Sequence, residues 1–305
     1  MGGAIQYEYD LEVLVDPVKN ADLDIVFISA TRTKGLQNWT ATADGNDVVW
    51  PRDFLGTDIP RARISSYAYH ISDWKEYDEH AKDLSMKLAE LRAGDTQPAP
   101  IVLVAHSVSG LVTAKVMSEE TNIAQHVQGL AFFATPFQDP DGDAPVSTLN
   151  AIIAKRCGYS DDKTTREAYV LQDLFENVSR QNTAIDVAVF TEFFGDTALV
   201  DDDIVGKPKE KYSVQSLPGE HDDICKFGSR KGVYGVVRRA LQRLVSPIDR
   251  DTSIAVLPGE CTRDTYRAST SSAEIENISG GIHLNNRGTV TYWSGGAGTI
   301  NFYQD

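Results

Sequence analysis

A serine placed directly after a short apolar segment is the strongest candidate for a nucleophile. The segment Ile101–Val104 leads into Ala105-His-Ser-Val-Ser109, and a helix-like stretch follows. A strand–serine–helix turn strains the serine backbone, so the residues two before and two after it must be small. Ala105 and Ser109 are small, although the usual Gly-x-Ser-x-Gly pattern has glycine at both places. The pattern predicts that Ser107 is a hydrolase nucleophile; the alternative is an ordinary strand-to-helix turn of a parallel α/β protein.

A nucleophilic serine needs a histidine base, and chain order selects His221. In this kind of site the histidine follows the last strand, and His221 lies in Leu217-Pro-Gly-Glu-His221, after the last strand candidate. The remaining histidines precede the serine, adjoin it, open a strand or lie in the tail: His70, His80, His106, His126 and His283.

A carboxylate must orient the histidine and stabilise its cation. Glu192 follows the strand-like segment Ile185–Phe190 and is the preferred candidate, with Asp196 and Asp201 as rivals in the same loop. The alternative is that these carboxylates only belong to a solvated acidic loop. Val108, as the residue after the nucleophile, is expected to supply one oxyanion-hole N–H.

Apolar spacing alternates between strand-like and helix-like along the chain. This order predicts an α/β fold, with a mainly parallel sheet and helices on both faces. The expected strands are Leu11–Val15, Leu23–Ser29, Ala62–Tyr69, Ile101–Val104, Val127–Ala134, Ile185–Phe190 and Tyr212–Leu217. The expected helices are Trp74–Leu91, Gly110–Glu119, parts of Pro145–Arg180, and Val233–Val245.

Composition narrows the partners and the compartment. The 305-residue chain has a formal net charge of −15, whereas nucleic acids and anionic membranes bind clustered Lys and Arg. We therefore expect no nucleic-acid partner and no strong membrane anchor. No apolar run approaches the ~18 residues of a membrane span, and residues 1–10 lack the apolar core of a secretory signal. The three cysteines are not in metal-ligand spacing, so a cytoplasmic location is expected.

Four sequence blocks together resemble a known family. They are Trp50–Leu55 with Asp58–Ile64, Ala105–Val112, Phe132–Phe137 and His221–Phe227. In this order they resemble the serine-esterase, lipase-like domain of fungal incompatibility and NLR-type signalling proteins, related to DUF676 and PGAP1-like hydrolases. The resemblance covers roughly residues 20–245 and implies an α/β-hydrolase fold acting on esters or lipids without a cofactor.

One block departs from that family. Members usually follow the strand at Ile25–Ile28 with His-Gly and further glycines, whereas this chain has Ser29-Ala30-Thr31. In the family that loop supplies the second oxyanion N–H, which the resemblance places at Thr31. Losing one such donor typically lowers turnover by ~100- to 1,000-fold, so hydroxyls of Ser29 or Thr31 would have to compensate.

The composition changes after the hydrolase-like domain, residues 1–245. Residues 246–276 are polar and indicate a linker. In residues 277–305, Gly288–Trp293 recurs as Gly298–Tyr303, with little charge and no proline. Such segments stack into cross-β assemblies and resemble the prion-like motifs that pair fungal effectors with an NLR-type receptor. A docked hairpin and an unstructured tail are the alternatives.

Two hypotheses follow from these features. The first is a serine esterase or lipase that acts as an incompatibility effector, with Ser107, His221 and Glu192 as its triad. The second is an inactive hydrolase fold that serves as an interaction module, assembled through its tail.

Overall fold

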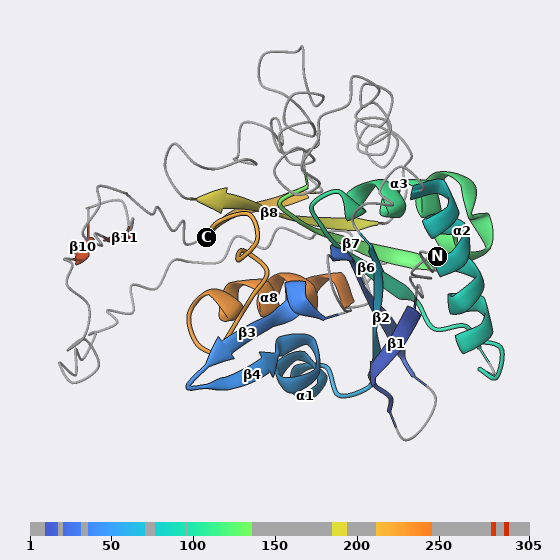
Figure 1. Ribbon diagram of the computed structural model, residues 1–305, viewed down its shortest axis with the longest axis horizontal. Coiled ribbons are helices and arrows are strands. Elements are labelled where there is room, and N and C mark those ends of the chain that lie inside the picture. The colour runs from blue at the N-terminus through green and yellow to red at the C-terminus, as the bar shows by residue number, and fades with distance from the viewer. Residues whose placement is uncertain are drawn as a thin grey trace, which may run out of the picture. The chain divides into compact units, whose positions relative to one another are not determined.

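A seven-stranded sheet forms the core of residues 1–247 in the computed structural model (Figure 1). The structure describes residues 10–17, 21–31, 36–70, 77–95, 97–135, 185–193, 212–245, 282–284 and 290–292. The strand order is β1-β5-β2-β6-β7-β8-β9. The bounds are β1 Asp10–Val15, β2 Leu23–Thr31, β5 Ala62–His70, β6 Ile101–His106, β7 Val127–Phe133, β8 Asp186–Phe193 and β9 Tyr212–Pro218.

The pairing of these strands gives the α/β-hydrolase fold. Only β1 is antiparallel to its neighbour, β5, and each later pair from β5–β2 to β8–β9 is parallel. All residues of β2 and of β6 are buried, as expected for strands covered on both faces. The carboxyl ends of β6, β8 and β9 therefore lie along one edge of the sheet, where ligands of open α/β sheets bind.

Helices cover the two faces of the sheet (Figure 1). On one face, Tyr69 stacks on His80 of α2, with ring centroids 4.3 Å apart. On the other, Phe27 meets Trp50 edge-on at 5.2 Å, and Trp50 contacts Tyr234 of α8 at 5.8 Å. The helices are η1 Gln37–Trp39, η2 Pro51–Leu55, α1 Gly56–Asp58, α2 Tyr77–Leu91, α3 Ser109–Glu119, α4 Thr121–Ala124 and α8 Val233–Val245.

Several expected boundaries are wrong by a few residues. Five strands extend past their predicted ends: β2 to Thr31, β6 to His106 and β8 to Phe193, and by a single residue β5 to His70 and β9 to Pro218. Several of the extra residues are polar, so they lack the apolar pattern of a strand, but their backbone still pairs with neighbouring strands. The prediction also missed the hairpin of β3 Thr40–Ala43 and β4 Asn46–Val49. The expected helices within Pro145–Arg180 lie outside the described residues.

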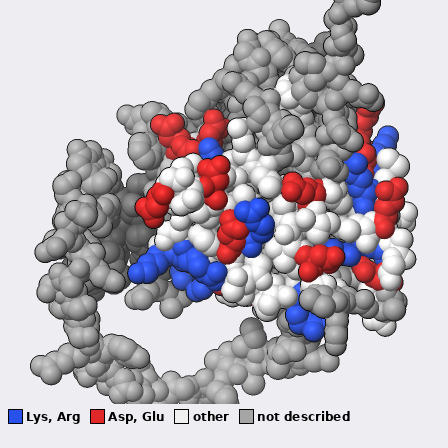
Figure 2. Space-filling view, turned by 60° about the horizontal axis from the view of Figure 1, so that its bottom comes forward, with Lys and Arg blue, Asp and Glu red and all other residues white. Residues whose placement is uncertain are grey.

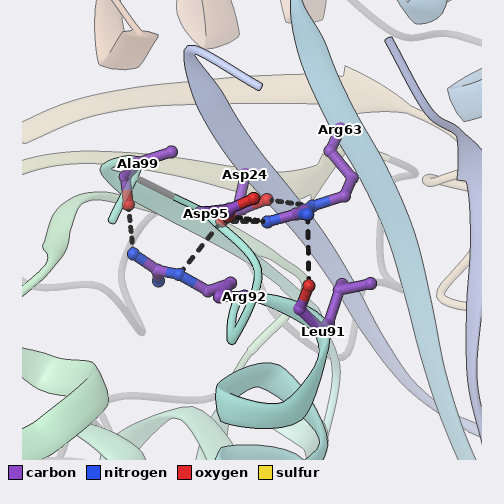
Figure 3. A network of polar contacts seen from close by, with 6 residues as sticks. All are labelled: Asp24, Arg63, Leu91, Arg92, Asp95 and Ala99. Atoms are coloured by element: carbon purple, nitrogen blue, oxygen red, sulfur yellow. Dashed lines mark hydrogen bonds and ion pairs between the residues drawn. The ribbon is translucent and has the colours of Figure 1, made fainter. Parts of the chain in front are cut away.

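Three buried charged residues and the half-buried Asp95 join the amino-terminal ends of β2 and β5 to the segment after α2 (Figure 3). Arg63 Nε donates to Asp24 Oδ1 at 2.7 Å, and its Nη2 donates to Asp95 Oδ2 at 2.8 Å. Arg92 Nε lies 3.4 Å from Asp24 Oδ2. Burial lowers the pKa of Arg92, whereas at Arg63 burial is outweighed by the bonds to Asp24 and Asp95, so the pKa of Arg63 is raised. Both guanidinium groups depend on Asp24.

We expect Asp24→Asn to destabilise the fold by about 3–5 kcal/mol, because it leaves the buried Arg92 without its ion-pair partner and leaves the buried Arg63 with Asp95 alone. The free energy of unfolding from urea titration measures the loss. Asp22→Asn is the matched control, because Asp22 pairs with Arg61 at the surface, where both side chains are more than half exposed. This control should leave the urea midpoint unchanged; an equal loss in both variants would contradict the burial argument.

Acidic and basic side chains alternate over the face seen in Figure 2. Local ion pairs among the described residues include Arg52 with Asp53 at 2.8 Å and Lys226 with Asp223 at 2.9 Å. None of the helices that the structure describes combines the length and the apolar character needed to cross a bilayer.

Residues 248–305 form a unit separate from residues 1–247. Within it, β10 Ile282–Leu284 pairs antiparallel with β11 Val290–Tyr292. The second copy of the predicted repeat, Gly298–Tyr303, lies outside the described residues, as does the predicted linker 246–276.

Candidate active site

Ser107 stands in a strained turn between β6 and α3. Its φ of 57° lies in the left-handed region, which a residue other than glycine adopts at a cost and which is concentrated at functional sites. The turn is held by its backbone: the Ser107 N–H donates to Phe133 O at 2.8 Å, and its carbonyl accepts from Thr135 Oγ1 at 3.0 Å. The strand–serine–helix turn expected from Ala105 and Ser109 is present.

His221 contacts the Ser107 hydroxyl directly. Ser107 Oγ and His221 Nε2 are 2.7 Å apart, across 114 residues of sequence. Both side chains are buried, with Ser107 0% and His221 1% exposed. At this distance Nε2 is placed to accept the serine proton, which is the geometry a general base requires.

Glu192 completes the chain of contacts by hydrogen bonding to His221 Nδ1. It is the second-last residue of β8 and is paired with Leu217 of β9, so its carboxylate comes from the strand itself rather than from the following loop. A carboxylate accepts only, so it fixes the tautomer with the proton on Nδ1 and leaves Nε2 free to accept. The rival acids Asp196 and Asp201 lie outside the described residues.

The backbone around His221 is also fixed. Gly219, at φ 144°, makes the turn out of β9, and a Cβ there would lie 3.3 Å from the Ile224 nitrogen. His106, next to the nucleophile, donates from Nε2 to the His221 carbonyl at 2.9 Å. His106 was not a candidate for the base because it adjoins the serine in sequence, and this adjacency lets it contact the loop of His221.

The two expected oxyanion donors occupy different surroundings. Val108 follows Ser107 at the start of α3, and its N–H donates to no other described residue. Thr31 is the last residue of β2 and pairs with His70 of β5, so the strand continues where a loop was expected. The buried Ser29 hydroxyl has no hydrogen-bond partner within the described part of the chain. The proposed compensation by Ser29 or Thr31 hydroxyls therefore stays untested.

Asn38 and Ser109 were not predicted to contact the backbone of β2. Asn38 Nδ2 donates to Ala30 O at 2.8 Å, and Ser109 Oγ accepts from Ala30 N at 3.0 Å. Ser109 was noted only for its size, and no local pattern around Asn38 marks such a contact. Among the described residues, no group of three or more His, Cys, Asp or Glu side chains is placed to hold a metal ion.

Sequence comparison finds a partial relative in vertebrates. Protein SERAC1 of Bos taurus is 25% identical over 139 residues, which are 37% of this chain and 21% of that protein. Protein SERAC1 of Homo sapiens is 28% identical over 139 residues, with the same shares of 37% and 21%. The similarity thus spans about a fifth of the length of these relatives. No family model matches the sequence.

Structural comparison finds lipases, esterases and thioesterases. Lipase BlEst2 of Bacillus licheniformis has a TM-score of 0.48 at 13% identity, covering 76% of this chain and 98% of that one. A thermophilic esterase of Thermogutta terrifontis has a TM-score of 0.47 at 13% identity, covering 79% and 95%. The roles proposed below therefore rest on the contacts of Ser107, His221 and Glu192.

Proposed function

We propose that the protein is a serine hydrolase of carboxylic esters or lipids. The observation that carries the proposal is the unbroken hydrogen-bond chain from Ser107 through His221 to Glu192, whose side chains are 0%, 1% and 3% exposed. Three residues from different strand ends meet at one edge of the sheet in the arrangement that nucleophilic catalysis requires.

The reaction follows from these positions. His221 Nε2 takes the proton of Ser107 as its Oγ attacks the ester carbonyl carbon. The negative charge that develops on the carbonyl oxygen is stabilised by the Val108 N–H at the start of α3. The positive charge on His221 is stabilised by Glu192. His221 then gives its proton to the departing alkoxide, and a water molecule, deprotonated by His221, releases the acid from Ser107. No step requires a cofactor.

A fluorophosphonate probe tests this proposal, because it reacts with a serine only when the hydroxyl is activated by a base. We expect the wild-type chain to be labelled on Ser107 and Ser107→Ala to be unlabelled, with intact-mass spectrometry locating the adduct. Ser118→Ala is the control, because Ser118 is an exposed serine near the end of α3, and it should label like wild type. Folded wild-type protein that stays unlabelled would reject a serine-hydrolase function.

That negative result is the outcome expected of the second candidate, an inactive hydrolase fold that acts as an interaction module. The feature that favours it is the sequence Ser29-Ala30-Thr31 in place of the glycines of the resembling family.

A biological setting is proposed from the sequence resemblance alone. In it, the protein is a cytoplasmic effector of fungal incompatibility that is engaged by an NLR-type receptor through residues 277–305. Thioflavin-positive fibrils from a peptide of those residues would support this setting, and a persistently soluble peptide would count against it.

A further inference from the structure

Ala30, one residue before the end of β2, has both of its backbone polar groups bound by side chains. Its N–H donates to Ser109 Oγ at 3.0 Å, and its carbonyl accepts from Asn38 Nδ2 at 2.8 Å. Ser109 is 79 residues and Asn38 is 8 residues away in sequence. Two separate elements, α3 and η1, therefore fix the two peptide groups on either side of Ala30.

These bonds lie on the side of β2 that faces the nucleophile. Successive residues of a strand direct their backbone groups to alternate sides. Asp24 donates to Pro100, the residue before β6, and Ala30, six residues later, faces the same side. The pairing of β2 with β6 ends at Ile28 and Ala105. Ala30 therefore lies just beyond the last paired residue of β2, on the side of the segment that leads from β6 to Ser107. The backbone groups of Thr31, one residue further on, point to the opposite side of β2, toward β5.

The Ser109 hydroxyl is itself held in place. Ser109 is 0% exposed and stands two residues after the nucleophile. Its Oγ lies 3.2 Å from the Tyr69 hydroxyl, and Tyr69 is in turn stacked on His80 of α2. A buried hydroxyl with these two contacts has little freedom to move away from Ala30.

We propose that Ser109 and Asn38 are positioning residues for the esterase reaction: they hold the end of β2 at a fixed distance from the Ser107–Val108 turn. The inference rests on the proposed function. A glycine at position 109, as in the usual nucleophile pattern, would have no atom to make the bond to Ala30. The wall of the oxyanion site is then fixed by two side-chain hydrogen bonds, and no glycine-rich loop is needed for it. Stabilisation of an oxyanion depends on such preorganisation, and small displacements lower turnover strongly.

The test compares Ser109→Ala with Ser66→Ala, a control that also removes a buried hydroxyl but one without a hydrogen-bond partner among the described residues. With a soluble ester, we expect Ser109→Ala to lower kcat about 10- to 100-fold and to leave KM within about twofold. Affinity for an alkyl boronic acid, whose serine adduct is tetrahedral like the intermediate, should fall by a similar factor. Ser109→Thr, which keeps the hydroxyl, should recover most of kcat, and Ser66→Ala should match wild type.

Asn38→Asp provides an independent variant, because it keeps the shape of the side chain and removes the N–H that binds Ala30. It should lower kcat and boronic-acid affinity as Ser109→Ala does, whereas Asn122→Asp, at an exposed position of α4, should not. Unchanged kcat and boronic-acid affinity in both folded Ser109→Ala and folded Asn38→Asp would overturn the inference and leave the esterase function standing. A higher kcat in Ser109→Ala would overturn the inference too, because the Ser109 hydroxyl would then slow the reaction instead of positioning the site for it. Folded wild-type protein that does not react with a fluorophosphonate rejects the proposed function itself.

Discussion

Replacing His221 by alanine is expected to lower kcat for a soluble ester by about 10⁶-fold, as loss of the base does in serine hydrolases of this kind. The Ser107 Oγ–His221 Nε2 distance of 2.7 Å makes His221 the acceptor of the serine proton. Without it the hydroxyl stays protonated at neutral pH and attacks slowly. Steady-state hydrolysis of a p-nitrophenyl ester by wild type and variant measures the effect, with folding matched by circular dichroism.

The matched control for this variant is His126→Ala. His126 is partly exposed before β7, and its backbone supplies its bonds to Ile101 and Ile123. We expect this variant to keep the kcat of wild type. If kcat fell by less than about tenfold in His221→Ala while His126→Ala kept the kcat of wild type, another group would have to serve as the base. The proposed mechanism would then be wrong.

Glu192→Gln should have the second-largest effect, a loss of about 10⁴-fold in kcat, as seen when the acid of such a triad becomes an amide. Glutamine fits the same space, but it does not stabilise the His221 cation, and its N–H can hold the histidine in the wrong tautomer. The same ester assay measures the loss. Glu220→Gln, one residue before His221 and exposed, is the control and should be active.

A nearly active Glu192→Gln would mean that the hydrogen bond between Glu192 and His221 is structural. The orienting acid would then have to be Asp196 or Asp201, and Asp→Asn variants at those positions would separate the two.

The fold and the positions of Ser107 and His221 along the chain could be predicted from short-range sequence patterns. The strained turn at Ser107 could be predicted because such a turn is local, with small residues at fixed positions, and the place of His221 because it follows the last strand. Val233–Val245 was predicted with the observed bounds of α8, since its apolar spacing repeats for three turns.

Other features depend on contacts that no local pattern contains. The bonds of Ala30 to Asn38 and Ser109 join segments 8 and 79 residues apart. Glu192 was placed after its strand because Thr191 and Glu192 are polar, whereas Thr191 bonds to Ser216 of β9 at 3.1 Å and the strand continues.

The β3–β4 hairpin, in contrast, did have a local signal. Asp44-Gly45 stands between its strands with φ values of 51° and 77°, and Asp-Gly is a preferred pair for such a two-residue turn. The flanking segments, Thr40–Ala43 and Asn46–Val49, carry too few large apolar side chains to stand out as strands.

The proposed catalytic residues come from β8 and from the turns after β6 and β9, and β7 lies between β6 and β8. Glu192 faces His221 only while it is paired with Leu217, because a slip of one residue in β8 would turn its carboxylate to the opposite face of the sheet. Under the proposed mechanism, Ser107 is therefore activated only in molecules whose strands β8 and β9 are paired in the observed register. In refolding experiments, the fraction of molecules that reacts with a fluorophosphonate would count correctly registered sheets and exclude compact but misaligned chains.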